Sequence, residues 1–125
     1  MLKKNIFSII VALIIMYLSL AGSETFKKVS FVNIPHIDKI VHFCMYFGFM
    51  SVIILENRSS LKSNRLLFLT ALIPLSYGIL MEFLQFALTI TRSASLYDIA
   101  ANSTGIFVAL LLWIWIKPVI KESIR

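Results

Sequence analysis

Residues 66–90, LLFLTALIPLSYGILMEFLQFALTI, form an almost wholly apolar run that contains one carboxylate, Glu82, and one amide, Gln85. The run is long enough to cross a bilayer as a helix, which takes about 17–25 residues. A carboxylate is costly in lipid and unusual in a soluble core, so Glu82 must be paired or protonated in either solvent. The first question is therefore which solvent surrounds this run.

The composition of the whole chain favours a membrane. Of its 125 residues, 59% are hydrophobic and 14% are charged, whereas a soluble domain has about 45–50% apolar and about 25% charged residues. A soluble fold of this length would have to bury nearly all of that apolar surface in one small core. We therefore predict an all-α polytopic membrane protein, with four transmembrane helices in one bundle and a single domain over residues 1–125. The predicted spans are residues 6–21, 37–55, 66–90 and 96–116.

The first apolar stretch has a second interpretation. Lys3 and Lys4 precede it, and Ser19-Leu20-Ala21 is an acceptable cleavage site, so this stretch also resembles a signal peptide. Retention as a helix is favoured, because the number of spans and the charge bias of the loops then agree.

The basic residues predict the orientation of the bundle, because cytoplasmic loops carry an excess of Lys and Arg. With four retained spans, eight basic residues lie on one side and four on the other, which places both termini in the cytoplasm. The net charge of +6 is spread between apolar runs and forms no stripe, so no nucleic-acid partner is expected. The larger set is Lys3, Lys4, Arg58, Lys62, Arg65, Lys117, Lys121 and Arg125, and the smaller set is Lys27, Lys28, Lys39 and Arg92.

Polar residues of three predicted spans converge at one depth. In this topology the second span begins on the outer side, the third ends there and the fourth begins there. Each carries near that end two polar residues three or four positions apart, which share one helix face. We therefore expect a small polar cavity open to the outer side, with His42, Arg92 or Asp98 as the partner of Glu82. The polar residues at this depth are Asp38, Lys39, His42, Glu82, Gln85, Arg92, Ser95, Asp98 and Asn102.

Small residues predict which face of the last span is turned inward. Ala101, Gly105 and Ala109 recur at every fourth position, a pattern typical of close helix packing in membranes. Asp98 and Asn102 lie on the same face, so they are expected to point into the bundle.

Simpler structural roles remain open for several of these residues. Ser95-x-x-Asp98 has the form of a capping box, so Asp98 could simply start its helix. Asp38 suits the positive end of a helix dipole, and Lys39 and Arg92 suit the membrane interface. The whole set could also be a structural network of ion pairs.

Three motifs follow one another along the chain. They are Asp38-Lys39-x-x-His42-Phe43-x-x-Tyr46-Phe47, Glu82-x-x-Gln85, and Arg92 followed by Asp98-x-x-x-Asn102-x-x-Gly105. In this order and spacing they resemble the VanZ-like family of bacterial membrane proteins, over roughly residues 38–116. The resemblance implies a short four-helix protein of the bacterial cytoplasmic membrane. It also adds Tyr46 to the candidate site, and the founding member of the family is associated with resistance to the glycopeptide teicoplanin.

The preferred interpretation is a binding or protective protein of the cell envelope. Its pocket would take an envelope lipid, a peptidoglycan precursor or a glycopeptide-like ligand at the outer leaflet, with Lys39 and Arg92 meeting anionic groups. A role in teicoplanin resistance would follow from the resemblance alone. The candidate ligand-binding residues are Asp38, Lys39, His42, Tyr46, Glu82, Gln85, Arg92, Ser95, Asp98 and Asn102.

The alternative is a membrane-embedded enzyme acting on a lipid-linked substrate. His42 would be its general acid or base, with Glu82 or Asp98 as the acidic partner, but no nucleophile motif accompanies them. A metal held by the same three residues is disfavoured, because only one strong nitrogen donor lies near the site; no metal or cofactor is expected. An ion-coupled transporter would need polar residues through the whole depth of the bilayer, and the inner halves of these spans lack them. The oligomeric state stays open.

Overall fold

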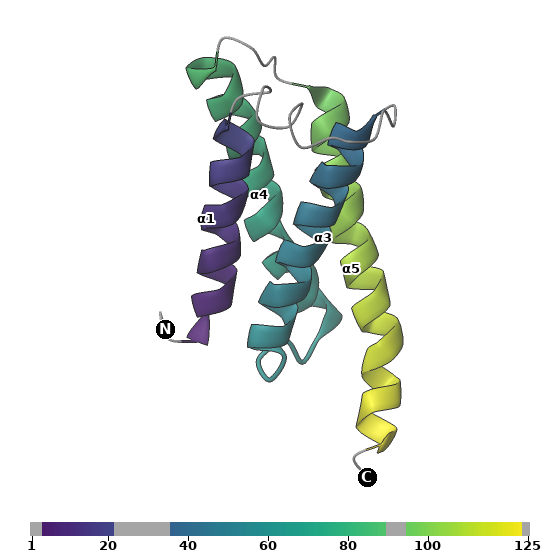
Figure 1. The fold of residues 1–125 in the computed structure, drawn as a ribbon. Coiled ribbons are helices and arrows are strands. Elements are labelled where there is room, and N and C mark those ends of the chain that lie inside the picture. The colour runs from purple at the N-terminus through teal and green to yellow at the C-terminus, as the bar shows by residue number, and fades with distance from the viewer. Residues whose placement is uncertain (1–3, 22–35, 90–94, 124–125) are drawn as a thin grey trace.

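The computed structural model describes residues 4–21, 36–89 and 95–123, and within these ranges the chain is helical and contains no strand. Its helices lie side by side in one bundle (Figure 1). The predicted all-α class is confirmed for this part of the chain. In chain order the helices are α1 (Ile6–Leu20), α3 (Ile37–Asn57), α4 (Asn64–Leu88) and α5 (Leu96–Ser123).

Three of the helices are long and apolar enough to cross a membrane: α3, α4 and the segment Leu96–Lys117 of α5. The helix α1 is apolar but has 15 residues, so it rises about 22 Å against a hydrocarbon core of about 30 Å. The structure therefore supports a helical membrane protein. A complete crossing by α1, and the side of the membrane on which the termini lie, stay predictions.

At one end of the bundle lie the start of α1, the connection between α3 and α4, and the C-terminal part of α5 (Figure 1). The ammonium group of Lys4 donates to the hydroxyl of Ser60 at 3.0 Å. Lys117 donates to the carbonyl of Lys62 at 3.0 Å. These basic residues thus meet at one end, as their grouping in the sequence predicts.

The helix α4 turns Glu82 and Gln85 into the bundle. Both side chains are 2% exposed, whereas their neighbours Phe83 and Phe86 are each 63% exposed. This alternation is the pattern of a helix with one face packed against its neighbours and the other available to lipid. The buried residues of α4 are Leu67, Ala71, Pro74, Gly78, Met81, Glu82 and Gln85.

The helix α1 is held at both ends by side chains of other helices. At its start, the carboxylate of Glu56 in α3 accepts hydrogen bonds from the backbone N–H groups of Phe7 at 2.8 Å and Ser8 at 3.0 Å. At its end, the amide of Gln85 donates to the carbonyl of Ser19 at 2.7 Å. Helix ends leave such backbone groups without intrahelical partners, so these bonds make α1 an integral part of the bundle.

The backbones of α3 and α5 approach each other closely at Gly105. A Cβ atom there would clash with the carbonyl oxygen of Phe43 and lie 3.0 Å from the backbone nitrogen of Phe47. Only glycine allows the two backbones to come this close. The predicted inward face of the last span is therefore confirmed at Gly105, and Ala109 one turn later is also buried.

Candidate functional site

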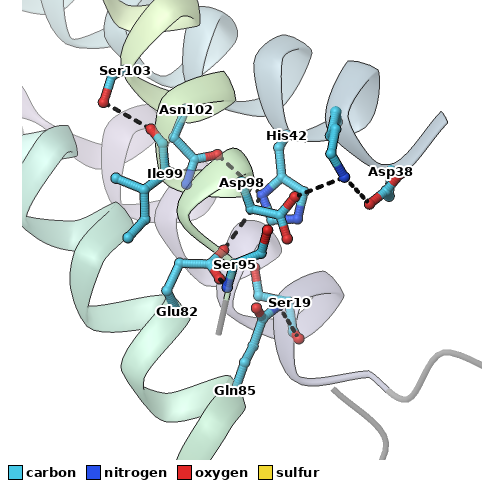
Figure 2. A network of polar contacts seen from close by, with 11 residues as sticks. Ser19, Asp38, His42, Glu82, Gln85, Ser95, Asp98, Ile99, Asn102 and Ser103 are labelled. Atoms are coloured by element: carbon cyan, nitrogen blue, oxygen red, sulfur yellow. Dashed lines mark hydrogen bonds and ion pairs between the residues drawn. The ribbon is translucent and has the colours of Figure 1, made fainter. Parts of the chain in front are cut away.

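A cluster of polar side chains lies at the other end of the bundle, among the start of α3, the end of α4 and the start of α5. Figure 2 shows His42, Glu82, Asp98 and Asn102 directed toward one another from these three helices. His42 is 5% exposed, and Glu82 and Asn102 are each 2% exposed. The convergence expected from the sequence is therefore present among these four residues.

The imidazole of His42 is positioned by α5. Its Nδ1 atom lies 3.0 Å from the side-chain oxygen of Asn102 and 3.9 Å from Oε1 of Glu82. An amide oxygen only accepts hydrogen bonds, so the contact with Asn102 places a proton on Nδ1. In the neutral ring Nε2 is then the acceptor, and in the protonated ring both nitrogens donate.

The carboxylate of Glu82 lies at the start of α5. Its Oε2 atom is 3.4 Å from the backbone nitrogen of Ser95, which donates to it just before the helix begins at Leu96. The first N–H groups of a helix lack intrahelical partners and carry a partial positive charge, so they stabilise an anion there. Glu82 thus links three elements: its own helix, the start of α5, and His42 of α3.

A chain of charges leads from the cluster toward the exposed rim. The ammonium group of Lys39 lies 3.7 Å from Oδ1 of Asp98 and 3.0 Å from Oδ2 of Asp38. The exposed fractions of the side chains rise from 14% for Asp98 to 31% for Lys39 and 49% for Asp38. Lys39 is therefore placed to exchange one of its carboxylate partners for an anionic group that arrives from outside.

The ring of Tyr46 packs over α4 beside Asn102. A Cβ atom at Gly78 would lie 3.1 Å from the Tyr46 ring and 3.2 Å from the amide nitrogen of Asn102. Gly78 is thus the residue that lets both side chains approach α4. Tyr46 is 1% exposed, and its hydroxyl has no hydrogen-bond partner among the described residues.

Of the candidate residues, Gln85 contacts a different partner and Arg92 is not described by the structure. The amide nitrogen of Gln85 is bound to the carbonyl of Ser19, so Gln85 serves the packing of α1 beside the cluster. Nothing in the sequence points to Ser19, because the acceptor is a backbone carbonyl that every residue carries. Arg92 lies outside the described residues, so its expected pairing with Glu82 stays a prediction.

The cluster also contains a set of metal-ligating atom types. His42, Glu82 and Asp98 each offer one ligand atom, and these atoms lie within 4.8 Å of one another. One imidazole nitrogen and two carboxylate oxygens suit a divalent ion such as Zn²⁺ or Mn²⁺. Lys39 would compete with a metal ion for the Asp98 carboxylate, since its ammonium group lies 3.7 Å from Oδ1.

Comparison with protein families identifies the family of the chain. The family model described as VanZ/LLP1 matches residues 3–117. This range covers α1, α3, α4 and the predicted membrane span of α5, together with every candidate site residue. No curated protein and no solved structure matches the chain.

Proposed function

The chain belongs to the VanZ-like family, and we propose that it is a cell-envelope membrane protein that binds a polar headgroup in the cluster between α3, α4 and α5. The ligand class is an envelope lipid, a peptidoglycan precursor or a glycopeptide-like molecule. The observation that carries the proposal is the burial of His42, Glu82 and Asn102 between apolar helices, with Lys39 at the rim.

The burial of ionisable groups in this cluster costs free energy. Placing ionisable groups between membrane helices costs several kcal/mol per charge unless each is paired, and apolar packing could replace a purely structural ion pair without loss of stability. The cluster also has a graded exposure, from Glu82 at 2% to the side chain of Asp38 at 49%. That gradient supports an entry route for a ligand rather than a closed structural network.

The side chains offer complementary chemistry to such a ligand. Lys39 would turn from Asp98 to a phosphate or carboxylate of the ligand, which frees Asp98 to accept from hydroxyl or amide groups. The bias of basic residues toward the opposite end of the bundle supports an outward orientation of the cluster. Lipid-linked precursors and glycopeptides are met at that face of the bacterial cytoplasmic membrane.

The test is binding by the purified full-length protein in lipid nanodiscs. The probes are a radiolabelled undecaprenyl-linked peptidoglycan precursor and teicoplanin, each measured against wild type, Asp98→Asn and Thr104→Ala. Thr104 is exposed on the same helix, and its hydroxyl donates to the carbonyl of Ala100. We expect saturable binding of one probe that Asp98→Asn weakens and Thr104→Ala leaves unchanged. Absence of binding, or equal effects of both substitutions, would contradict the proposal.

Catalysis on a lipid-linked substrate is the second candidate, and one observation favours it. The Nδ1 atom of His42 contacts the side-chain oxygen of Asn102 and lies 3.9 Å from the buried carboxylate of Glu82, an arrangement suited to a general acid or base. Turnover of the radiolabelled precursor that is lost in both His42→Ala and Glu82→Gln would establish the enzyme. Binding without turnover would leave the first proposal.

In cells, the proposal predicts that the chain contributes to teicoplanin resistance. Expression of the chain in a teicoplanin-sensitive bacterium is expected to raise the inhibitory concentration, and Asp98→Asn is expected to remove the increase. An unchanged inhibitory concentration, at equal membrane abundance, would show that this chain does not share the property of the founding member.

A further inference from the structure

A cavity lies in the half of the bundle opposite to the polar cluster. It has a volume of about 600 Å³, is open on one side, and is lined by the start of α1, the end of α3, the connection that follows it and the first half of α4. Ligand pockets in proteins span about 300–1,000 Å³, so this space is large enough for a ligand. None of the polar cluster residues lines it.

The lining changes from polar to apolar along the bundle. At the end of the bundle the lining combines the polar side chains of Asn5, Ser8, Asn57 and Ser60 with Leu61 and Leu66, and its deeper part is mainly apolar, from Ile9, Ala12, Phe49, Ile53 and Ile73. The hydroxyls of the remaining lining residues, Thr70 and Tyr77, are bound to backbone carbonyls. On α4 the lining residues run from Leu66 to Tyr77, a rise of about 16 Å, or roughly half of a hydrocarbon core about 30 Å thick. The cavity therefore has the depth and polarity of one leaflet of a bilayer.

Specific contacts define the deep end of this space. The hydroxyl of Tyr77 donates to the carbonyl of Ala12 at 2.5 Å, which joins α4 to α1 there. The rings of Tyr77 and Phe49 pack edge to face, with their centroids 5.6 Å apart. Ser8 and Ala12 lie four residues apart on α1 and carry small side chains, so the face of α1 toward the cavity leaves room that larger residues would fill.

The mouth of the cavity is basic. The ammonium group of Lys4 lies 3.0 Å from the hydroxyl of Ser60, a lining residue. Arg58, Lys62 and Arg65 are exposed at the same end. The carboxylate of Glu56 also lies at this end, where it accepts from the backbone N–H groups of Phe7 and Ser8 and from the hydroxyl of Ser8, a lining residue. These three bonds direct it at the start of α1.

We propose that this cavity holds an anionic glycerophospholipid of the membrane leaflet at this end of the bundle. One acyl chain would occupy the apolar part, and the phosphate would lie at the mouth against Lys4, with the hydroxyl of Ser60 donating a hydrogen bond. The charge bias of the loops makes this the cytoplasmic leaflet. The site is separate from the polar cluster, so it does not depend on the function proposed for that cluster.

The test compares two lipids with identical acyl chains, one with an anionic headgroup and one with a zwitterionic headgroup. Full-length protein in mild detergent is titrated with phosphatidylglycerol or phosphatidylcholine of identical acyl chains, and bound lipid is counted by native mass spectrometry. We expect one tightly held phosphatidylglycerol and about tenfold weaker retention of phosphatidylcholine. Equal retention of both lipids would overturn the proposal.

Matched variants separate a site from general attraction. Lys4→Gln should reduce the preference for phosphatidylglycerol about fivefold, as expected for one lysine at an anionic surface, and Lys4→Arg should restore it. Arg65→Gln removes the same charge at the same end. Neither residue lines the cavity, but Lys4 donates to the lining residue Ser60, and no such bond is present for Arg65 among the described residues. An equal effect of Arg65→Gln would mean that the charge attracts lipid without a defined site.

A substitution that fills the cavity tests whether an acyl chain occupies it. Ala12→Phe should abolish retention of both lipids, whereas Leu13→Phe, at a position 54% exposed, should leave retention unchanged. A photoreactive acyl chain on phosphatidylglycerol tests the wild-type protein directly, even if Ala12→Phe does not fold. It should label Ile9 and Ile53, which line the cavity, in preference to Leu13. Uniform labelling of the exposed faces, or lipid retention by a folded Ala12→Phe variant, would refute the proposal.

Discussion

The side-chain amide of Gln85 in α4 donates a 2.7 Å hydrogen bond to the main-chain carbonyl of Ser19, next to the last residue of α1. Gln85 lies one turn after Glu82 on the same buried face. The two residues nevertheless serve different neighbours: Figure 2 shows Gln85 directed to Ser19, and Glu82 directed to the start of α5 and His42. One short motif thus both anchors the first helix and builds the polar cluster.

Gln85→Leu is expected to destabilise the protein without removing the cluster. The substitution leaves the Ser19 carbonyl without its side-chain donor, which should cost about 1–3 kcal/mol. Chemical unfolding in detergent measures this loss, and binding of the precursor or glycopeptide probe measures the cluster. Unchanged stability together with lost binding would instead make Gln85 a ligand residue, as the sequence motif predicts.

Gly105→Ala is expected to disrupt the packing of α3 against α5. A Cβ atom there meets the backbone of Phe43 and Phe47, which cannot move aside as a side chain would, so a loss of about 1–3 kcal/mol or more is expected. Gly48→Ala is the matched control, because a Cβ at Gly48 meets nothing within 4 Å. It should stabilise its helix by about 0.5–1 kcal/mol. Thermal unfolding measures both variants. Equal stabilities of the two would contradict the close packing inferred at Gly105.

Glu82→Gln is expected to fold but to bind poorly. Glutamine keeps the size of the side chain and an oxygen that can accept from the Ser95 N–H, while it replaces the ionisable carboxyl group beside His42 with a neutral amide. Probe affinity should fall about tenfold or more, as for the loss of one charged hydrogen bond. Unfolding curves provide the control, since a matching fall in stability would show that the charge is needed for folding. Glu82→Leu should abolish binding altogether.

The orientation of the bundle is tested by cysteine labelling in intact cells. In a Cys44→Ser background, a cysteine at the exposed position Lys62 should react only after the membrane is permeabilised. A cysteine at Lys28, outside the described residues, is expected to react from outside without permeabilisation. Labelling of position 62 in intact cells would reverse the orientation, and with it the leaflet assigned to each end of the bundle.

The sequence by itself determined the positions of the helices along the chain and the depth of the polar residues within the bundle. Apolar runs of bilayer length separated by basic segments predict membrane helices, and the predicted and observed spans begin within two residues of each other for α3, α4 and α5. The depth of Asp38, Glu82 and Asp98 within one end of the bundle then follows from the direction of each span. The spacing of polar residues along a helix also predicts that Glu82 and Asp98 face inward, whereas the expected inward direction of Asp38 is not observed, because its side chain lies at the exposed rim. These features depend on local sequence, so the chain order suffices to infer them.

The tertiary structure alone decided which partner each polar group meets. His42 contacts Asn102, sixty positions away along the chain, while Gln85 contacts a backbone carbonyl that no side-chain pattern marks. The cavity beside α1 likewise depends on how Ser8 and Ala12 face α3 and α4. Several pairings of these groups would satisfy the same charges and hydrogen bonds at one depth. The rotation of each helix, set by close contacts such as Gly105 against Phe43, selects among them.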